Sequence, residues 1–377
     1  MIMKILYDIS FITPYNLVKG IPVHSLRILN AISINDRKDI LLLINKEMTK
    51  YVDENLKGYS YIIYPSFHGA SQKIFNRSLG KFIYKHIVEG SHSNVLIVPD
   101  EYRPITNQRF KVNKCIFIHD LKGTKADYAE NVKDRLKYSK FFCDAIKTAD
   151  IVFAISQYTK DDISKTFANA DMGKIHVLYN GVEMPSTSEM PKLMDGNKPY
   201  ILSINFLDRY KNVLTTIQAF DLVANDYPGK LVIVSKPTEY WDKVCLPFIE
   251  EKKLRDRIVL LSDLSVEEIK WLYENADLFV SSSSHEGFGF TPIEAAICCC
   301  PVICTDAEAL PETTLGLLNY YTPATDCNVL ANGILQLLNN PTPKSELMRI
   351  SELLQNKYSP ERQVARMKQL LSDHLKS

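Results

Sequence analysis

Short apolar runs alternate along this chain with longer segments in which apolar residues recur every three or four positions. The short runs have the length and composition of buried strands, and the longer segments have the period of amphipathic helices. This alternation predicts an α/β fold with parallel sheets that carry helices on both faces. The predicted strands are residues 4–7, 40–44, 61–64, 95–98, 115–118, 151–154 and 175–178 in the first half, and 200–204, 231–234, 258–261, 278–280 and 302–304 in the second.

The organisation into domains follows from length and from one polar stretch. A chain of 377 residues predicts two domains at roughly 100 to 200 residues each. Residues 183–199 are polar, contain three prolines and show no period, so we place the linker there. We therefore expect a first Rossmann-like domain at residues 1–185, a second at 186–358 and a closing helix at 359–377.

Candidate chemistry is concentrated in the loop and helix that follow the predicted strand at 278–280. Gly287 and Gly289 lie between the strand end and a helix start, where backbone N–H groups can bind a phosphate or diphosphate. Thr291 is the predicted N-cap of that helix, and Glu294 either completes a capping box with it or contacts a ligand. Glu286 has no capping role. It is either a solvated loop acid or a group that contacts neutral hydroxyls beside the phosphate.

The spacing of Glu286 and Glu294 in the segment HEGFGFTPIEA resembles the E-x7-E signature of retaining glycosyltransferases of family 4, which have the GT-B fold. The resemblance implies that Glu286 lies by the donor sugar and that Glu294 binds the ribose hydroxyls of the nucleotide. It also implies that backbone amides between them hold the diphosphate. These amides belong to Gly287, Phe288, Gly289 and Phe290.

Other segments extend the resemblance over most of the chain. His119 at a predicted strand end resembles the family's histidine near the donor sugar, and Asn180-Gly181-Val182 resembles the segment where the first domain passes to the second. Lys211 resembles the base that binds the diphosphate, together with Arg209, which stands one residue off the usual place. Only Gly20 matches the family's N-terminal glycine-rich loop.

The helix after Glu294 also departs from the family. Cys298, Cys299 and Cys300 stand where the family usually has a small residue and glycine. Without glycine, we expect this helix to end without a left-handed residue.

The implied reaction moves a hexose-type sugar from a UDP or GDP sugar to a glycan or a lipid-linked acceptor, with retention, in surface polysaccharide or lipopolysaccharide synthesis. Glu286, His119 and Lys211 are the implied catalytic residues, and no metal or other cofactor is expected. Alternatives are a GT-B-like sugar-nucleotide epimerase, a phosphorylase or a non-catalytic sugar-binding protein. A dinucleotide dehydrogenase is disfavoured, because no Gly-x-Gly-x-x-Gly follows the first strand. The segment from residue 360 resembles the family's last helix, which returns to the first domain.

Charge is distributed unevenly between the two halves of the chain. Residues 1–185 hold 26 Lys and Arg against 19 Asp and Glu, whereas residues 186–377 hold 19 against 25. A basic stripe on a predicted helix is either a solvated face or a contact with an anionic membrane. Its members are Lys73, Arg77, Lys81 and Lys85.

We expect no nucleic-acid partner. The eight cysteines include no Cys-x-x-Cys pair, and neighbouring helical residues such as Cys298–Cys300 cannot ligate one ion together. With no apolar window long enough for a span and a strand-like start, these features predict a cytoplasmic enzyme, either free or peripheral at the inner face of the membrane.

Overall fold

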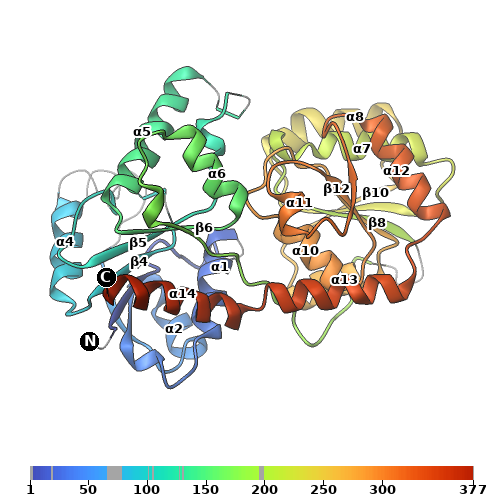
Figure 1. Cartoon of the computed structure of the whole chain (residues 1–377). Coiled ribbons are helices and arrows are strands. Elements are labelled where there is room, and N and C mark those ends of the chain that lie inside the picture. Colours follow the sequence, from blue (N-terminus) through green and yellow to red (C-terminus); the bar gives the residue numbers. More distant parts are fainter. Residues whose placement is uncertain are drawn as a thin grey trace. The chain divides into compact units, whose positions relative to one another are not determined.

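The computed structural model describes residues 3–17, 20–65, 79–100, 102–103, 106–126, 128–129, 131–194 and 199–376. The chain divides into two compact units (Figure 1). The first unit comprises Met1–Gly181 with Pro360–Ser377, and the second comprises Val182–Ser359. The division lies four residues before the boundary expected after residue 185, and it assigns the last helix to the first unit.

The first unit contains a parallel sheet in the order β3-β2-β1-β4-β5-β6-β7. Its strands are β1 (Ile5–Asp8), β2 (Ile40–Asn45), β3 (Ser60–Tyr64), β4 (Val95–Val98), β5 (Asn113–Ile118), β6 (Ile151–Ala154) and β7 (Ile175–Val177). Every residue of β1, β4 and β6 is buried, as expected for a sheet covered on both faces. The strand order changes direction between β1 and β4, and open α/β sheets bind ligands at the carboxyl ends of strands at such a point.

Helices cover both faces of this sheet. They are α1 (Gly20–Ala31), α2 (Thr49–Asn55), α4 (Lys81–Gly90), α5 (Val132–Thr148), α6 (Gln157–Thr166) and α14 (Pro360–Lys376). Tyr84 of α4, Phe142 of α5 and Ile163 of α6 share one apolar cluster, so these helices lie on the same face. On the other face, α14 packs against α1 (Figure 1).

The second unit repeats this design with the strand order β10-β9-β8-β11-β12-β13, again parallel. Its strands are β8 (Tyr200–Ile204), β9 (Lys230–Val234), β10 (Ile258–Leu261), β11 (Leu278–Ser281), β12 (Val302–Thr305) and β13 (Asn319–Tyr321). Its helices are α7 (Val213–Val223), α8 (Leu246–Glu251), α9 (Val266–Asn275), α10 (Phe290–Ile297), α11 (Leu310–Thr313), α12 (Cys327–Asn339) and α13 (Lys344–Lys357). The order changes direction between β8 and β11, so we expect the ligand site of this sheet there.

The predicted strands are all present, each within two residues of its predicted ends. β13 was missed, because Asn319–Tyr321 is only three residues long and lies at the edge of its sheet, where a long apolar run is not required. The α/β fold with two parallel, Rossmann-like units is therefore confirmed.

The chain leaves the first unit and returns to it at two neighbouring points. A Cβ atom on Gly181 would lie 2.6 Å from Cα of Pro360, so only glycine permits this approach. Next to it, the backbone N–H of Val182 donates to the carbonyl of Tyr358 at 2.7 Å.

The end of α10 corrects one expectation. Cys299 adopts a left-handed conformation with φ of +58°, although it is not glycine. The N–H of Cys300 donates to the carbonyl of Ala295 and that of Cys299 to the carbonyl of Ala296, both at 3.0 Å. This is the Schellman pattern, so the helix ends in the usual way with a cysteine in the glycine position.

Candidate active site

The loop between β11 and α10 leaves the second sheet at its carboxyl edge, and Gly289 determines where the helix begins. Gly289 has φ of +84° and is the N-cap, so Phe290 is the first helical residue. A Cβ atom on Gly289 would lie 2.3 Å from Cδ2 of Leu310. Both constraints require glycine. The predicted start, with Thr291 as N-cap, is therefore wrong by two residues.

Glu294 consequently lies inside α10, as its fifth residue, and does not cap it. Its Oε2 accepts a hydrogen bond from the hydroxyl of Tyr273 at 3.5 Å. Burial, reinforced by the charge of Glu294, raises the pKa of Tyr273 well above its usual value, so this tyrosine stays a donor. The N-cap is a glycine without a capping side chain, which leaves the start of α10 suited to an anion.

Lys211 and Glu286 form an ion pair at the carboxyl edge of the second sheet. Lys211 ends a short 3-10 helix after β8, and Glu286 follows β11, the neighbouring strand. The Nζ of Lys211 donates to Oε1 of Glu286, and the side chains are only 15% and 13% exposed. The structure thus brings together two of the predicted site residues. Glu286 stands three positions before the N-cap of α10.

Glu308, which the sequence analysis missed, holds the Glu286 loop in place. Its Oε2 accepts the backbone N–H of Glu286 at 2.8 Å, and its Oε1 lies 3.0 Å from Nδ1 of His285. The backbone N–H of Ala309 donates to the carbonyl of Glu286 at 3.2 Å. The only sequence signal was an acid three residues after β12, at the same edge of the sheet.

Asn212 is a second positioning residue that the sequence analysis missed. It adopts a left-handed conformation with φ of +47°. Its side-chain amide donates to the carbonyl of Ser282 at 3.0 Å and to Oγ of Ser284 at 2.5 Å. These bonds connect the loop after β8 to the loop after β11 and so fix Lys211 relative to Glu286.

The other residues predicted in the second unit have different surroundings. Arg209 is exposed on the 3-10 helix that carries Lys211. The side chain of Phe288 is buried, with its ring centroid 5.1 Å from that of Tyr358, so only its backbone can contact a ligand. Gly287 is half-buried in the same loop.

His119 lies at the carboxyl end of β5 in the first unit and is buried. Its Nε2 is 2.8 Å from the carbonyl oxygen of Pro99, to which it donates. Burial lowers the pKa of His119, so its ring is neutral near pH 7. Burial opposes ionisation of the adjacent Asp120, but Lys122, which donates to it at 2.9 Å, outweighs this and lowers its pKa.

Two further predictions concern the first unit. Gly20 is the first residue of α1, and no atom lies within 4 Å of the place where a Cβ would stand, so packing does not require glycine. Lys73 and Arg77 lie outside the described residues. Lys81 and Lys85 are exposed on α4.

A buried polar network lies at the carboxyl end of β1 and was also missed. Asp8 is fully buried and forms an ion pair with Arg103. It also accepts hydrogen bonds from the hydroxyls of Tyr84, at 2.5 Å, and Ser10, at 2.7 Å. An arginine is therefore held at the point where the first sheet changes direction.

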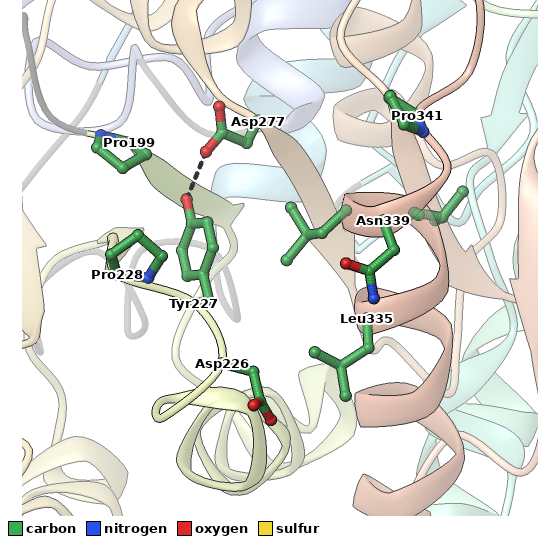
Figure 2. Close-up of a pocket in the computed structure, with 10 residues that line it drawn as sticks. Pro199, Asp226, Tyr227, Pro228, Asp277, Leu335, Asn339 and Pro341 are labelled. Atoms are coloured by element: carbon green, nitrogen blue, oxygen red, sulfur yellow. Dashed lines mark hydrogen bonds between the residues drawn. The ribbon is translucent and has the colours of Figure 1, made fainter.

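A groove of about 660 Å³ lies elsewhere in the second unit (Figure 2). Pro199 and Asp277, which line it, stand just before β8 and β11, at the amino edge of the sheet. The hydroxyl of Tyr227 donates to Asp277 there at 2.7 Å. Because Lys211 and Glu286 lie at the opposite edge, this groove is separate from the candidate site.

Comparison with known proteins decides the family of the second unit. The family of glycosyl transferases group 1 matches residues 187–357, nearly the whole of that unit. The chain contains a glycosyl transferase group 1 domain. The O-antigen chain mannosyltransferase RfbU of Salmonella typhimurium is 28% identical over 211 residues, which cover 56% of this chain and 57% of that protein. O-antigen chain mannosyltransferase B of Escherichia coli is 25% identical over 217 residues, 55% of this chain and 57% of that protein.

Solved structures share the fold of this chain over nearly its full length. HepE of Anabaena, in complex with UDP and glucose, has a TM-score of 0.75 at 15% identity, covering 98% of this chain and all of the other. Sucrose-phosphate synthase of Thermosynechococcus elongatus has a TM-score of 0.78 at 18% identity, covering 99% of each. These likenesses show the GT-B fold.

The alignment spans a little over half the length of the curated relatives described above. Within the described residues, none of the helices combines the length and the hydrophobicity that crossing a membrane requires.

Proposed function

We propose that this protein is a retaining glycosyltransferase of family 4 that moves a hexose-type sugar from a nucleoside diphosphate sugar, of UDP or GDP type, to a glycan or lipid-linked acceptor. The observation that carries the proposal is the Lys211–Glu286 pair beside the start of α10, in a unit that matches glycosyl transferases group 1. The mannosyltransferase relatives support synthesis of a surface polysaccharide as the setting.

Charge on the departing diphosphate is stabilised by the second unit. Lys211 supplies an ammonium group, and the first N–H groups of α10 supply the positive end of the helix dipole. Pro292 has no N–H, so the helix itself offers the N–H groups of Phe290 and Thr291. The loop before the helix completes the proposed diphosphate site with the backbone N–H groups of Gly287, Phe288 and Gly289. With this cationic cradle, the proposed reaction proceeds without a metal.

Glu286 and Glu294 address the two hydroxyl-bearing parts of the donor. Glu286, whose backbone is fixed by Glu308, contacts hydroxyls of the transferred sugar, and Glu294 accepts hydrogen bonds from the ribose. In the first unit, neutral His119 orients the sugar. The donor phosphate takes the acceptor proton, and configuration is retained.

Titration of UDP, GDP, uridine and guanosine by calorimetry tests the role of Lys211. A hydrogen bond to a charged group contributes roughly 1.5–3 kcal/mol, so Lys211→Ala should weaken the diphosphates about 10- to 100-fold and the nucleosides little. Lys252→Ala is the matched control. Nζ of Lys252 also lies near a carboxylate, 3.9 Å from Asp221, but Lys252 stands between α8 and the start of β10, away from the carboxyl edge of the sheet. Equal weakening of nucleotide and nucleoside would contradict the assignment.

The variant Glu286→Gln tests whether Glu286 acts on the transferred sugar or on binding of the diphosphate. The variant releases Lys211 from its ion pair, so we expect diphosphate affinity to be unchanged or higher, while the transfer rate falls. Parallel losses of affinity and rate would show that Glu286 only shapes the loop. Incubation of the wild type with sugar nucleotides alone would reveal an epimerase, which would convert the donor without any acceptor.

We further propose that the acceptor is lipid-linked and that the enzyme acts in the cytoplasm at the inner face of the membrane. On α4, Phe82 is 72% exposed between Lys81 and Lys85, and on α5 Leu136 is 62% exposed beside Lys137. Exposed apolar side chains among lysines match a surface that binds anionic lipid.

Flotation with phosphatidylcholine vesicles, with and without phosphatidylglycerol, tests this contact. Changing Lys81, Lys85, Lys133 and Lys137 to Gln should weaken binding to the anionic vesicles, and added salt should do the same for the wild type. The control changes four exposed lysines in and around α2: Lys38, Lys46, Lys50 and Lys57. Salt-insensitive binding, or equal loss in the control, would contradict the contact.

A further inference from the structure

His24 is a buried histidine of α1 to which the proposed reaction gives no role. Its ring is fully buried, and its Nε2 lies 2.8 Å from Nε2 of Gln363, which is buried on α14. Both residues belong to the first unit, as does His119. A hydrogen bond between two such buried side chains fixes the orientation of both.

The direction of this hydrogen bond is set by Gly181. The backbone N–H of Gly181 donates to Oε1 of Gln363 at 2.8 Å, so the amide group of Gln363 turns its NH₂ towards His24. An amide NH₂ can only donate, so Nε2 of His24 accepts and the proton of its neutral ring is on Nδ1. That Nδ1 is buried and has no hydrogen-bond partner among the described residues. The tautomer of His24 is thus dictated by a backbone N–H at the residue where the chain leaves the first unit.

His24 in turn contacts His119. The two ring centroids are 5.2 Å apart and the planes cross at 86°. Phe117 packs against both rings, with centroid distances of 5.1 Å to His24 and 6.2 Å to His119. Together with the hydrogen bond to Pro99, this packing fixes the ring plane of His119.

We propose that Gln363 and His24 are positioning residues that hold the His119 ring in its orientation at the carboxyl end of β5. The contacts form a continuous series from Gly181 through Gln363 and His24 to His119. The inference rests on the proposed function for the role of His119 in transfer, but the series itself can be tested without activity. It assigns a function to the contact between α14 and α1 beyond packing.

Two variants test the contact between Gln363 and His24 and the contact between His24 and His119 separately. Gln363→Glu keeps an acceptor for Gly181 but replaces the NH₂ donor by a carboxylate oxygen, so His24 must move its proton to Nε2 or take up a second one. His24→Phe keeps an aromatic ring against His119 but removes the acceptor. Gln369→Glu is the matched control, because Gln369 is exposed on the same helix.

The readouts are ¹⁵N NMR of the histidine rings and steady-state kinetics of sugar transfer. In Gln363→Glu we expect the His24 ring to change from the Nδ1–H to the Nε2–H form or to become protonated, and the His119 signals to shift. In both variants kcat should fall about 10- to 100-fold, as for a slightly misplaced group, while KM for the donor stays nearly constant. The control should change neither readout.

Two results would overturn the proposal. One is His119 signals that do not move in either variant, whatever the rate does. The other is a full additional loss of kcat when His24→Phe is combined with His119→Ala, because a residue that acts through His119 has nothing further to lose once that ring is gone. If His24→Phe does not fold, Gln363→Glu decides alone. A wild type without transfer activity would refute the proposed function, while the NMR signals would still decide the positioning.

Discussion

Gly289→Ala is expected to destabilise the second unit by about 2–5 kcal/mol, and the structure supplies both parts of this figure. A side chain at the φ of +84° costs roughly 1–2 kcal/mol, because the Cβ approaches the following carbonyl. The new methyl group would also lie 2.3 Å from Cδ2 of Leu310, a fully buried side chain, and such overpacking costs about 1–3 kcal/mol. The start of α10 would shift, so UDP or GDP should also bind less tightly.

Tryptophan fluorescence during urea unfolding measures this effect in the relevant unit. Both tryptophans, Trp241 and Trp271, lie in the second unit. Leu310→Ala provides the matched background, because it removes the atom that the new methyl group would meet. In that background Gly289→Ala should cost only about 1–2 kcal/mol, the part due to φ.

Two outcomes of the double-mutant cycle would contradict this expectation. If Gly289→Ala costs less than about 0.5 kcal/mol in the wild type, as at an ordinary surface position, Gly289 is not held in the left-handed conformation. If the cost is the same in both backgrounds, Leu310 does not limit the space beside it. In either case the helix start that we describe, and the anion site built on it, would need revision.

Three further predictions concern other positions. Cys299→Gly should make the second unit about 1 kcal/mol more stable to urea than Cys299→Ala, because only glycine relieves the φ of +58°, and equal stabilities would contradict the left-handed helix end. Burial lowers the pKa of Lys114 to about 7 in the folded first unit, against about 10.4 unfolded, so the unfolded chain binds more protons between these values and stability should rise with pH. Urea unfolding followed by far-UV circular dichroism at pH 7 and 9 should show a rise of at most about 1.4 kcal/mol per pH unit that is missing in Lys114→Met, and parallel slopes would refute it. Glu294→Gln should weaken UDP or GDP binding in calorimetry with little change in the urea midpoint of the second unit, whereas a large stability loss at normal affinity would make Glu294 structural.

The sequence by itself determined the fold class, the strands except β13, and the position of the second unit's candidate site residues after two of those strands. These features are local: an apolar run of about three to five residues between helical segments is enough to predict a buried strand, and the order of such runs predicts parallel sheets. The same local pattern placed Lys211 and Glu286 after two strands, and the structure shows that those strands are neighbours.

Only the tertiary structure decided how the site is held. Thr291 is a good N-cap by sequence, yet α10 begins at Phe290, because Gly289 takes the left-handed N-cap conformation and the space beside it is filled by Leu310, a residue 21 positions later. Glu308 carries no sequence signal that separates it from other acids, and its role depends on β12 lying beside β11.

In the first unit, too, a contact depends on residues that are far apart in the sequence. His24 and Gln363 are separated by 339 positions and meet only because α14 packs on α1. Local pattern fixes which residues reach the carboxyl edge of a sheet, because strand direction and side-chain alternation are properties of short segments. Which of these residues contact one another depends on how helices and strands that are distant along the chain pack together.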